Sequence, residues 1–204
     1  TQRVLTSSGS KTYDANTNAL AADITLSNLV SGEALNHSGT ASTSSANVGS
    51  YTISNLTGIT IADGSGGTAS NYTLTGGTHN FAINQRPLNA TLARQYDGTT
   101  NAAGSDLSSF DALQGGETLT LNGSGTAAND NVANGISVSS LGSLALVNGT
   151  GLASNYSLNS AAINITQRVL TSSGSKTYDA NTNALAADIT LSNLVSGEAL
   201  NHSG

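Results

Sequence analysis

The chain has 204 residues, among them 23 Gly and one Pro, and it contains no Cys, Met or Trp. Only 9% of the residues are charged, and the formal net charge is −6. This composition is unlike that of a typical enzyme or coiled coil, and it argues against charge-rich disorder. The acidic balance disfavours nucleic acid or an anionic membrane as a partner, and no apolar run approaches the roughly 20 residues that span a bilayer.

The first 84 residues carry the pattern of short strands. Large apolar and small polar residues alternate in six segments, at 3–6, 23–29, 51–54, 58–62, 71–75 and 79–84. Clusters of Gly, Asn, Asp and Ser predict turns between them, at 7–10, 31–33, 63–67 and 76–77. Residues 20–22 favour one helical turn, but no window shows a sustained period of 3.6 residues. We therefore predict an all-β fold.

The sequence repeats at two lengths. Residues 1–39 return without a change at 166–204, and inside this long period short motifs return at offsets of 82 to 84 residues. This predicts two diverged modules, 1–84 and 85–165, followed by the first half of a third, 166–204. The motifs that define the repeat are Tyr-Asp (Tyr13, Asp14, Tyr96, Asp97, Tyr178, Asp179), Gly-Glu (Gly32, Glu33, Gly116, Glu117) and Asn-Tyr (Asn71, Tyr72, Asn155, Tyr156).

The junction between the first two modules, residues 81–88, has no flexible Gly/Ser spacer. This favours a semi-rigid string over beads on a loose linker. We expect small β-sandwich-like (immunoglobulin-like) domains in tandem, arranged end to end. The alternative is a fibre of strand-exchanged or β-grasp-like modules.

Three acids recur in every module, represented in the first by Asp14, Asp23 and Glu33. They are candidates for an acid/base pair or for calcium ligands. The simpler interpretation is that Asp after Tyr fixes a turn and that Glu after Gly lies at a hairpin. The loop 63–67 has the composition of a calcium loop, but its counterpart 147–151 lacks the carboxylate. We therefore expect no cofactor, with calcium as a minor alternative.

Histidines and nucleophiles give no catalytic pattern. His37 and His202 occupy one position, which is Leu121 in the second module, and His79 has no matching His. Metal sites need several ligands brought together, so these positions predict no metal site. No Gly-x-Ser-x-Gly elbow and no phosphate-binding loop before a helix occurs. We expect no enzyme activity.

Lys11 and Lys176 lie near Asn residues, which raises the alternative of a Lys–Asn isopeptide cross-link. The second module has Arg94 at this place, and Arg cannot form that bond. An ion pair with a neighbouring acid is the simpler prediction.

Five of the six tyrosines recur at fixed places in the repeat: Tyr13, Tyr72, Tyr96, Tyr156 and Tyr178. They are compatible with an exposed row that stacks on sugars. Recurrent Tyr in small β domains favours a core anchor whose hydroxyl bonds to the backbone.

The Tyr-Asp segments, above all Tyr-Asp-Gly-Thr-Thr at 96–100, resemble the YDG repeat domains of large bacterial surface proteins, which belong with the mostly-β, glycine-rich (MBG) domains. The resemblance extends to an opening Gln-Arg strand, the Gly-Glu motif and a closing Ala-Ser-Asn-Tyr segment. Only the second module keeps the full triplet, and Asp-Ala in the others predicts a different turn. The resemblance implies a stalk or filament role in filamentous-haemagglutinin-like exoproteins and other adhesins, and it implies no catalytic residues.

We therefore predict a stalk or filament segment of an exported bacterial adhesin or extracellular matrix fibre, located at the cell surface. Its expected partners are neighbouring modules, other copies in a fibre and a surface receptor, without nucleic acid or membrane insertion in this segment. The alternatives are a multivalent glycan- or protein-binding repeat and a subunit that self-assembles by strand pairing. A half module at 166–204 would leave strands unpaired unless another chain completes it.

Overall fold

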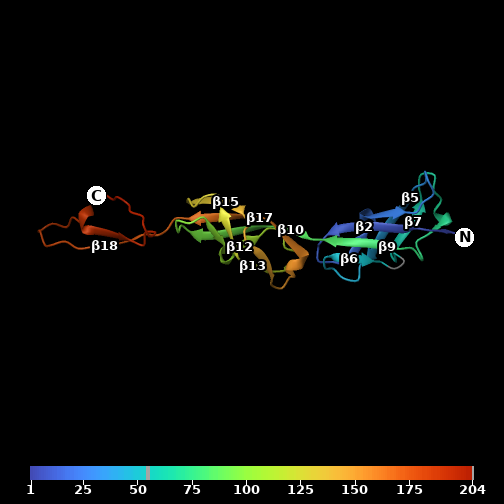
Figure 1. Cartoon of the computed structure of the whole chain (residues 1–204), viewed down its shortest axis with the longest axis horizontal. Coiled ribbons are helices and arrows are strands. Elements are labelled where there is room, and N and C mark those ends of the chain that lie inside the picture. Colours follow the sequence, from blue (N-terminus) through green and yellow to red (C-terminus); the bar gives the residue numbers. More distant parts are fainter. Residues whose placement is uncertain (54–55, 204) are drawn as a thin grey trace. The chain divides into compact units, whose positions relative to one another are not determined.

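The computed structural model describes residues 1–53 and 56–203 (Figure 1). Their secondary structure consists of strands and five short 3-10 helices of three residues each, so the predicted all-β class is confirmed. None of the helical segments in the described part of the chain is long and apolar enough to cross a membrane. Close contacts divide the chain into two compact units.

Unit 1 contains Thr1–Leu88 together with Asp111–Thr120 and Leu146–Asn159. Its largest sheet has the order β4-β2-β9-β6, formed by Ile24–Ser27, Thr6–Thr12, His79–Asn84 and Gly49–Thr52. The two central strands, β2 and β9, run parallel with Ser7 opposite His79, and β4 and β6 flank them in the antiparallel sense.

Two smaller sheets complete the first module. β3, β5 and β7 form one of them, at Asn18–Leu20, Leu35–Ser42 and Ile59–Asp63. β1 (Arg3–Val4) pairs in parallel with β8 (Tyr72–Thr73). The 3-10 helices η1 (Ala21–Asp23) and η2 (Ala69–Asn71) lead into β4 and β8. The largest buried apolar side chains here include Leu5, Leu56, Phe81 and Ile83.

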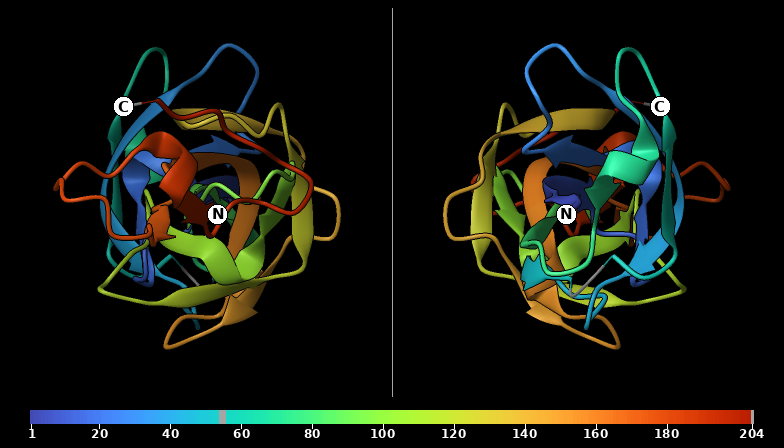
Figure 2. Two further views of the ribbon diagram at one scale, coloured as in Figure 1. Left: turned by 90° about the vertical axis from the view of Figure 1, so that its left-hand side faces the viewer. Right: turned by 90° about the vertical axis from the view of Figure 1, so that its right-hand side faces the viewer.

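Unit 2 contains Asn89–Phe110, Leu121–Ala145 and Ser160–Gly204. Its main sheet is a curled half-barrel of six strands in the order β11-β14-β15-β17-β10-β12 (Figure 2). The strands are Asn101–Ala103, Ser124–Ala127, Ala133–Ser140, Tyr156–Thr166, Arg86–Gln95 and Leu107–Phe110. The remaining elements of the second module are β13 (Leu119–Asn122), which pairs with β16 (Ala145–Asn148), and the 3-10 helices η3 (Gly104–Asp106) and η4 (Ala153–Asn155).

The half module at the end of the chain folds less completely than its identical copy. β18 (Thr171–Gly174) pairs with β19 (Ile189–Ser192) and is exposed along its length, and η5 (Ala186–Asp188) precedes β19. The same sequence in the first module forms the longer β2, which has β9 as a second neighbour. Tyr178 is accordingly 90% exposed, whereas the equivalent Tyr13 is 3% exposed. Within the described residues, β18 and β19 form a sheet of two strands.

The predicted elements are confirmed in part. The strand at 79–84 and the helical turn near 20–22 are confirmed, and the strands at 23–29, 58–62 and 71–75 are shortened or shifted. Of the strand at 51–54, residues 51–52 belong to β6, and Ser54 lies outside the described residues. The sandwich arrangement and the module boundaries at 84 and 165 stay predictions.

The turn predicted at 7–10 is wrong, because these residues lie in the middle of β2. Gly9 packs under the ring of Phe81, and a Cβ on Gly9 would lie 2.9 Å from that ring and 2.3 Å from the carbonyl oxygen of Asp23. Glycine is therefore required at this position of β2, and together with the serines beside it this gives a composition that is also typical of a turn. β5 was not predicted for a similar reason, because most of its residues are small and polar.

Candidate functional site: a tyrosine–glutamate cluster

The repeat motifs meet at one carboxylate in unit 1. Glu117 accepts the hydroxyl of Tyr13 at 2.7 Å through Oε1 and that of Tyr156 at 2.6 Å through Oε2. The two rings meet edge to face, with centroids 5.3 Å apart. Tyr156 also accepts the backbone N–H of Gln114 at 3.0 Å. We call Tyr13, Glu117 and Tyr156 the tyrosine–glutamate cluster.

The two tyrosines of the cluster are buried, at 3% and 2% exposed. Burial, followed by the hydrogen bond to Glu117, raises the pKa of Tyr13 to about 12 and raises that of Tyr156 as well. Both phenols therefore stay neutral and act as hydrogen-bond donors. The cluster therefore joins residues of two successive modules through hydrogen bonds to one carboxylate.

Hydrogen bonds between a repeat tyrosine and a Gly-Glu carboxylate also occur at two other places, each with one tyrosine. Within the first module Tyr72 bonds to Glu33 and accepts the N–H of Val30 at 3.1 Å. In unit 2 the hydroxyl of Tyr96 donates to Glu198 at 2.5 Å. Each Gly-Glu carboxylate thus takes the Asn-Tyr hydroxyl of its own module, the Tyr-Asp hydroxyl of the preceding module, or both.

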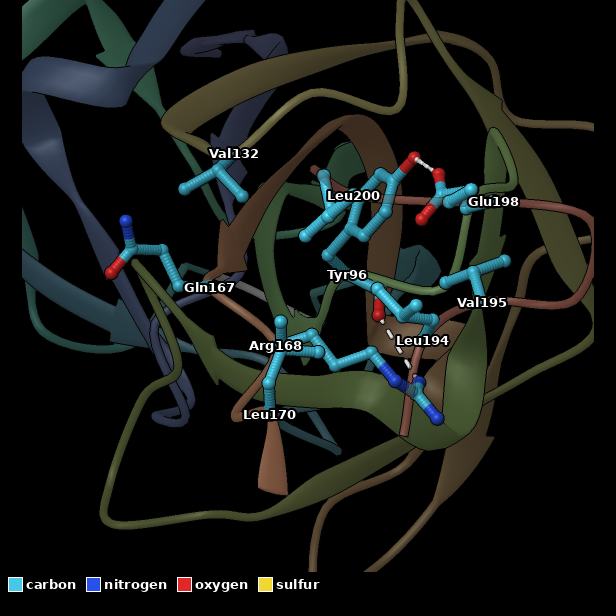
Figure 3. A pocket seen from close by; sticks show the side chains of 10 residues that line it. Tyr96, Val132, Gln167, Arg168, Leu170, Leu194, Val195, Glu198 and Leu200 are labelled. Atoms are coloured by element: carbon cyan, nitrogen blue, oxygen red, sulfur yellow. Dashed lines mark hydrogen bonds between the residues drawn. The ribbon is translucent and has the colours of Figure 1, made fainter. Parts of the chain in front are cut away.

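The Gln-Arg motif supports these contacts through backbone carbonyls. Arg86 donates to the carbonyl oxygens of Ala112 at 2.9 Å and of Tyr13 at 3.3 Å. Arg168 makes the equivalent hydrogen bonds, to the carbonyl oxygens of Asn193 at 2.6 Å and of Tyr96 at 3.3 Å (Figure 3). An Arg at the start of one module therefore holds the backbone at the Tyr-Asp motif of the module before it.

Asn155 provides a second link within unit 1. Its side chain is 1% exposed, accepts the backbone N–H of Val48 at 2.9 Å and donates to the side chain of Asn47 at 3.0 Å. An unpaired buried amide is costly, so these bonds fix the place of Asn155. Asn71, the corresponding residue of the first module, lies at the end of η2, and its N–H bonds to the carbonyl of Thr68.

The Asp residues of the Tyr-Asp motif serve a local turn. Oδ1 of Asp14 accepts the N–H of Asn16 at 3.2 Å, and Asp97 and Asp179 repeat this at 3.0 and 3.1 Å. Burial alone would raise the pKa of Asp14, but the hydrogen bond from Lys11 and the backbone N–H hold that pKa below its usual value.

The ion pairs predicted beside this turn are present. Lys11 lies 2.8 Å from Asp14, Lys176 lies 2.9 Å from Asp179, and Arg94 pairs with Asp97. The amide oxygen of Asn16 accepts a hydrogen bond from Lys11 at 2.8 Å.

The predicted difference between Asp-Gly and Asp-Ala turns is wrong. Gly98 has φ 72°, and Ala15 and Ala180 have φ 62° and 61°. The alanines thus adopt the left-handed conformation that glycine takes more readily. The Asp side chain and the ion pair beside it impose the same turn on both sequences.

Gly32 and Gly116 lie in the turns that precede Glu33 and Glu117. The hairpin interpretation is wrong, because these turns join strands of different sheets, β4 to β5 and β12 to β13. Asp63, the acid of the loop considered for calcium, accepts the N–H of Ala69 at 2.7 Å. Its counterpart Asn148 accepts the N–H of Ala153 at 2.8 Å, so either side chain caps the following 3-10 helix. No three His, Cys, Asp or Glu side chains in residues 1–53 and 56–203 come together as metal ligands.

Each histidine has a structural contact. Nε2 of His37 lies 2.9 Å from the carbonyl oxygens of Ala21 and Ile24, and His202 makes the equivalent contacts. His79 is 1% exposed, with Nδ1 3.0 Å from Ser7 Oγ and Nε2 2.8 Å from the carbonyl of Leu74. The buried pair of Ser7 and His79 was not predicted from the sequence. A His at the start of a predicted strand, with no His at the corresponding place of the second module, could have indicated it.

The comparisons with known proteins agree with this repeat pattern. The model of the YDG domain matches residues 1–79 and again 84–164, as two tandem copies. No curated protein matches the chain, and no solved structure does so either. Because the two matches cover well over half of the sequence, the chain belongs to the YDG domain family.

Proposed function

We propose that the chain is a structural segment of an exported bacterial adhesin or extracellular matrix fibre, acting as a stalk or filament at the cell surface. The observation that carries this proposal is the contact between Tyr13 and Glu117, which come from successive YDG copies. The most regular residues of the repeat are engaged in joining one copy to the next. A repeat with this property is suited to building length.

The composition supports the same proposal. A chain with a net charge of −6 and few charged side chains repels its neighbours weakly and stays soluble when repeated. We further infer that the modules are small sandwich-like domains placed end to end, and that the segment carries no catalytic activity. Its expected partners are the adjacent modules, with a receptor bound elsewhere in the parent protein.

Small-angle X-ray scattering of the purified chain tests the stalk. A compact globule of 204 residues has a radius of gyration of about 17 Å. We expect a clearly larger value and a pair-distance distribution with a long tail. A second polypeptide, in which the 165-residue period is duplicated, is expected to have a larger maximum distance in this distribution, because each added period should lengthen the stalk. A value near that of the globule in both would refute the stalk.

Location at the cell surface is tested separately in the bacterium that carries the gene. Antibodies raised against the chain are expected to label intact cells. External protease is expected to remove the label without lysis. Labelling that requires permeabilised cells would contradict this part of the proposal.

Self-assembly by strand pairing is a second candidate, because β4 and β6 form the two edges of the four-stranded sheet of unit 1. The multivalent glycan-binding alternative has less support, because Tyr13, Tyr72 and Tyr156 are buried and offer no face to a sugar. A glycan array with the intact chain distinguishes it, since saturable binding there would favour a binding repeat.

A further inference from the structure

Lys11, on β2, holds its amine in a polar site that is largely withdrawn from solvent. The side chain of this lysine is 8% exposed. Its Nζ lies 2.8 Å from Oδ1 of Asp14, 2.8 Å from the side-chain oxygen of Asn16 and 2.9 Å from the backbone oxygen of Asn16. A surface lysine usually extends its amine into water. Here the amine is directed at one carboxylate and one side-chain amide.

The turn that follows β2 fixes the position of this amide. Oδ1 of Asp14 accepts the backbone N–H of Asn16 at 3.2 Å, and Ala15 between them has φ 62°. The side-chain oxygen of Asn16 also accepts the backbone N–H of Asn18 at 2.9 Å. The amide of Asn16 is therefore held from both sides beside the amine of Lys11.

These contacts bring together the groups that an exchange of amides needs. A lysine amine withdrawn from water is a nucleophile, and a carboxylate next to it can take and return a proton. A backbone N–H directed at a carbonyl oxygen stabilises the negative charge that develops there when the carbon is attacked. In the first module these parts are Lys11, Asp14 and the N–H of Asn18, and the carbon is Cγ of Asn16.

The second module has the same turn without the reactive groups. Arg94 and Thr99 stand where the first module has Lys11 and Asn16. The ion pair with Asp97 is present there, and Arg94 donates to the backbone oxygen of Thr99 as Lys11 does to that of Asn16. The turn therefore forms without an amine and without a side-chain amide, so folding of the turn does not explain why the first module has both.

We propose that Lys11 and Asn16 become joined by an isopeptide bond in the folded protein. Asp14 takes a proton from Nζ, and the neutral amine attacks Cγ of Asn16 to form the new C–N bond. Asp14 then passes the proton to the amide nitrogen of Asn16, the bond between Cγ and that nitrogen breaks, and ammonia leaves. Nζ releases a second proton to solvent through Asp14, so the reaction needs no oxidant and no further reactant. The bond ties the end of β2 to the Tyr-Asp turn, and the inference does not rest on the stalk role.

The mass of the intact chain tests this bond. Lys176, Asp179 and Asn181 repeat the three residues with equivalent contacts, so the test uses the full chain with Lys176→Arg. An isopeptide bond in this variant then has to involve Lys11. Mass spectrometry of the unfolded variant is expected to give the mass of its sequence less that of one ammonia.

Digestion with trypsin locates the bond. Trypsin cleaves after Lys and Arg but not after a lysine whose amine is acylated. In the Lys176→Arg chain, residues 4–11 would be released as a fragment of their own, because they lie between Arg3 and the cleavage site after Lys11. We expect this fragment to be absent and residues 4–11 to stay attached to the residues that follow, with the cross-link to Asn16 visible in the fragment spectrum.

The second module suggests the control variants, which are made in the same Lys176→Arg chain. Lys11→Arg and Asn16→Thr each introduce the residue that the second module has at this place, and each is expected to restore the full mass. Asp14→Ser keeps a side-chain acceptor for the turn but removes the carboxylate, and it is expected to show the full mass as well. Circular dichroism verifies that all variants keep their strands.

Four results would overturn the proposal. A full mass together with release of residues 4–11 would mean that the three residues form an ion pair and hydrogen bonds alone. A loss of ammonia that persists in Lys11→Arg would assign the loss to a ring closure at another Asn. A loss that persists in Asn16→Thr would give the lysine a different partner. Complete reaction in Asp14→Ser would remove the carboxylate from the mechanism.

Discussion

Tyr13 donates its hydroxyl to Glu117 at 2.7 Å, although the two residues are separated by more than a hundred positions and lie in successive repeats. Tyr178, which has the same sequence neighbours as Tyr13, is 90% exposed. The chain thus holds one tyrosine in two environments, which provides an internal control for what the contact contributes.

Tyr13→Phe is expected to lower the free energy of unfolding by about 1–3 kcal/mol, because a buried bond to a charged acceptor is lost. The matched variant Tyr178→Phe is expected to change it by less than about 0.5 kcal/mol, as at most exposed positions. Urea unfolding followed by circular dichroism measures both. Equal effects would show that the contact to Glu117 contributes nothing specific.

Ser7 and His79 form a buried polar pair in the first module. Counted from the Gln-Arg motif, the second module has Ala90 and Ala161 at these positions, both buried. Ser7→Ala alone is expected to cost about 1–3 kcal/mol, because it leaves a buried ring nitrogen without a partner.

The double variant Ser7→Ala/His79→Ala is expected to cost less than the sum of the two single changes, since it removes both polar groups together. A double-mutant cycle in urea measures the coupling. Strict additivity would contradict it.

The residues that form the regular contacts of this repeat could be predicted from the sequence, whereas the residues to which they bond could not. Tyr-Asp, Gly-Glu and Asn-Tyr stand out because each recurs at a fixed place, and the Asx turn of Asp14 follows from its position. The bond from Tyr13 to Glu117 was hidden, because periodicity within one strand carries no information on a partner in the next repeat. The turn predicted at residues 7–10 was wrong because Gly9 of β2 lies beneath the ring of Phe81, and the small residues found there are also typical of turns.

Gly9→Ala and Gly174→Ala make a second matched pair. Both new methyl groups would meet a backbone carbonyl at 2.3 Å, but only the one at Gly9 would also meet a ring, that of Phe81, at 2.9 Å. We expect Gly9→Ala to destabilise the chain by more than about 2 kcal/mol through overpacking, and Gly174→Ala to affect it much less. Thermal melting of the two variants tests this. A larger shift for Gly174→Ala would mean that the half module is the more tightly packed copy.

Ala15→Gly is expected to stabilise the chain by roughly 0.5–1 kcal/mol. Ala15 has φ 62°, a left-handed conformation that costs a non-glycine residue about 1–2 kcal/mol, and the greater freedom of glycine in the unfolded chain offsets part of the gain. Gly98→Ala, the reverse change at the equivalent turn, is expected to destabilise. Chemical unfolding of both variants gives the signs, and a loss of stability in Ala15→Gly would mean that the turn is not strained.

The raised pKa of Tyr13 gives the chain a defined response to alkali. Burial, and then the bond to Glu117, place this pKa at about 12, against about 10 in the unfolded chain. The contribution of the group to stability is therefore fully present below pH 10 and is lost as the pH rises through 12, because the unfolded chain releases the proton first. Absorbance at 295 nm is expected to show a late phase of tyrosine ionisation above pH 10, to which Tyr13, Tyr72 and Tyr156 contribute. In Tyr13→Phe the late phase must shrink and the fall in stability above pH 10 must become shallower. An unchanged late phase would place the high pKa on another tyrosine.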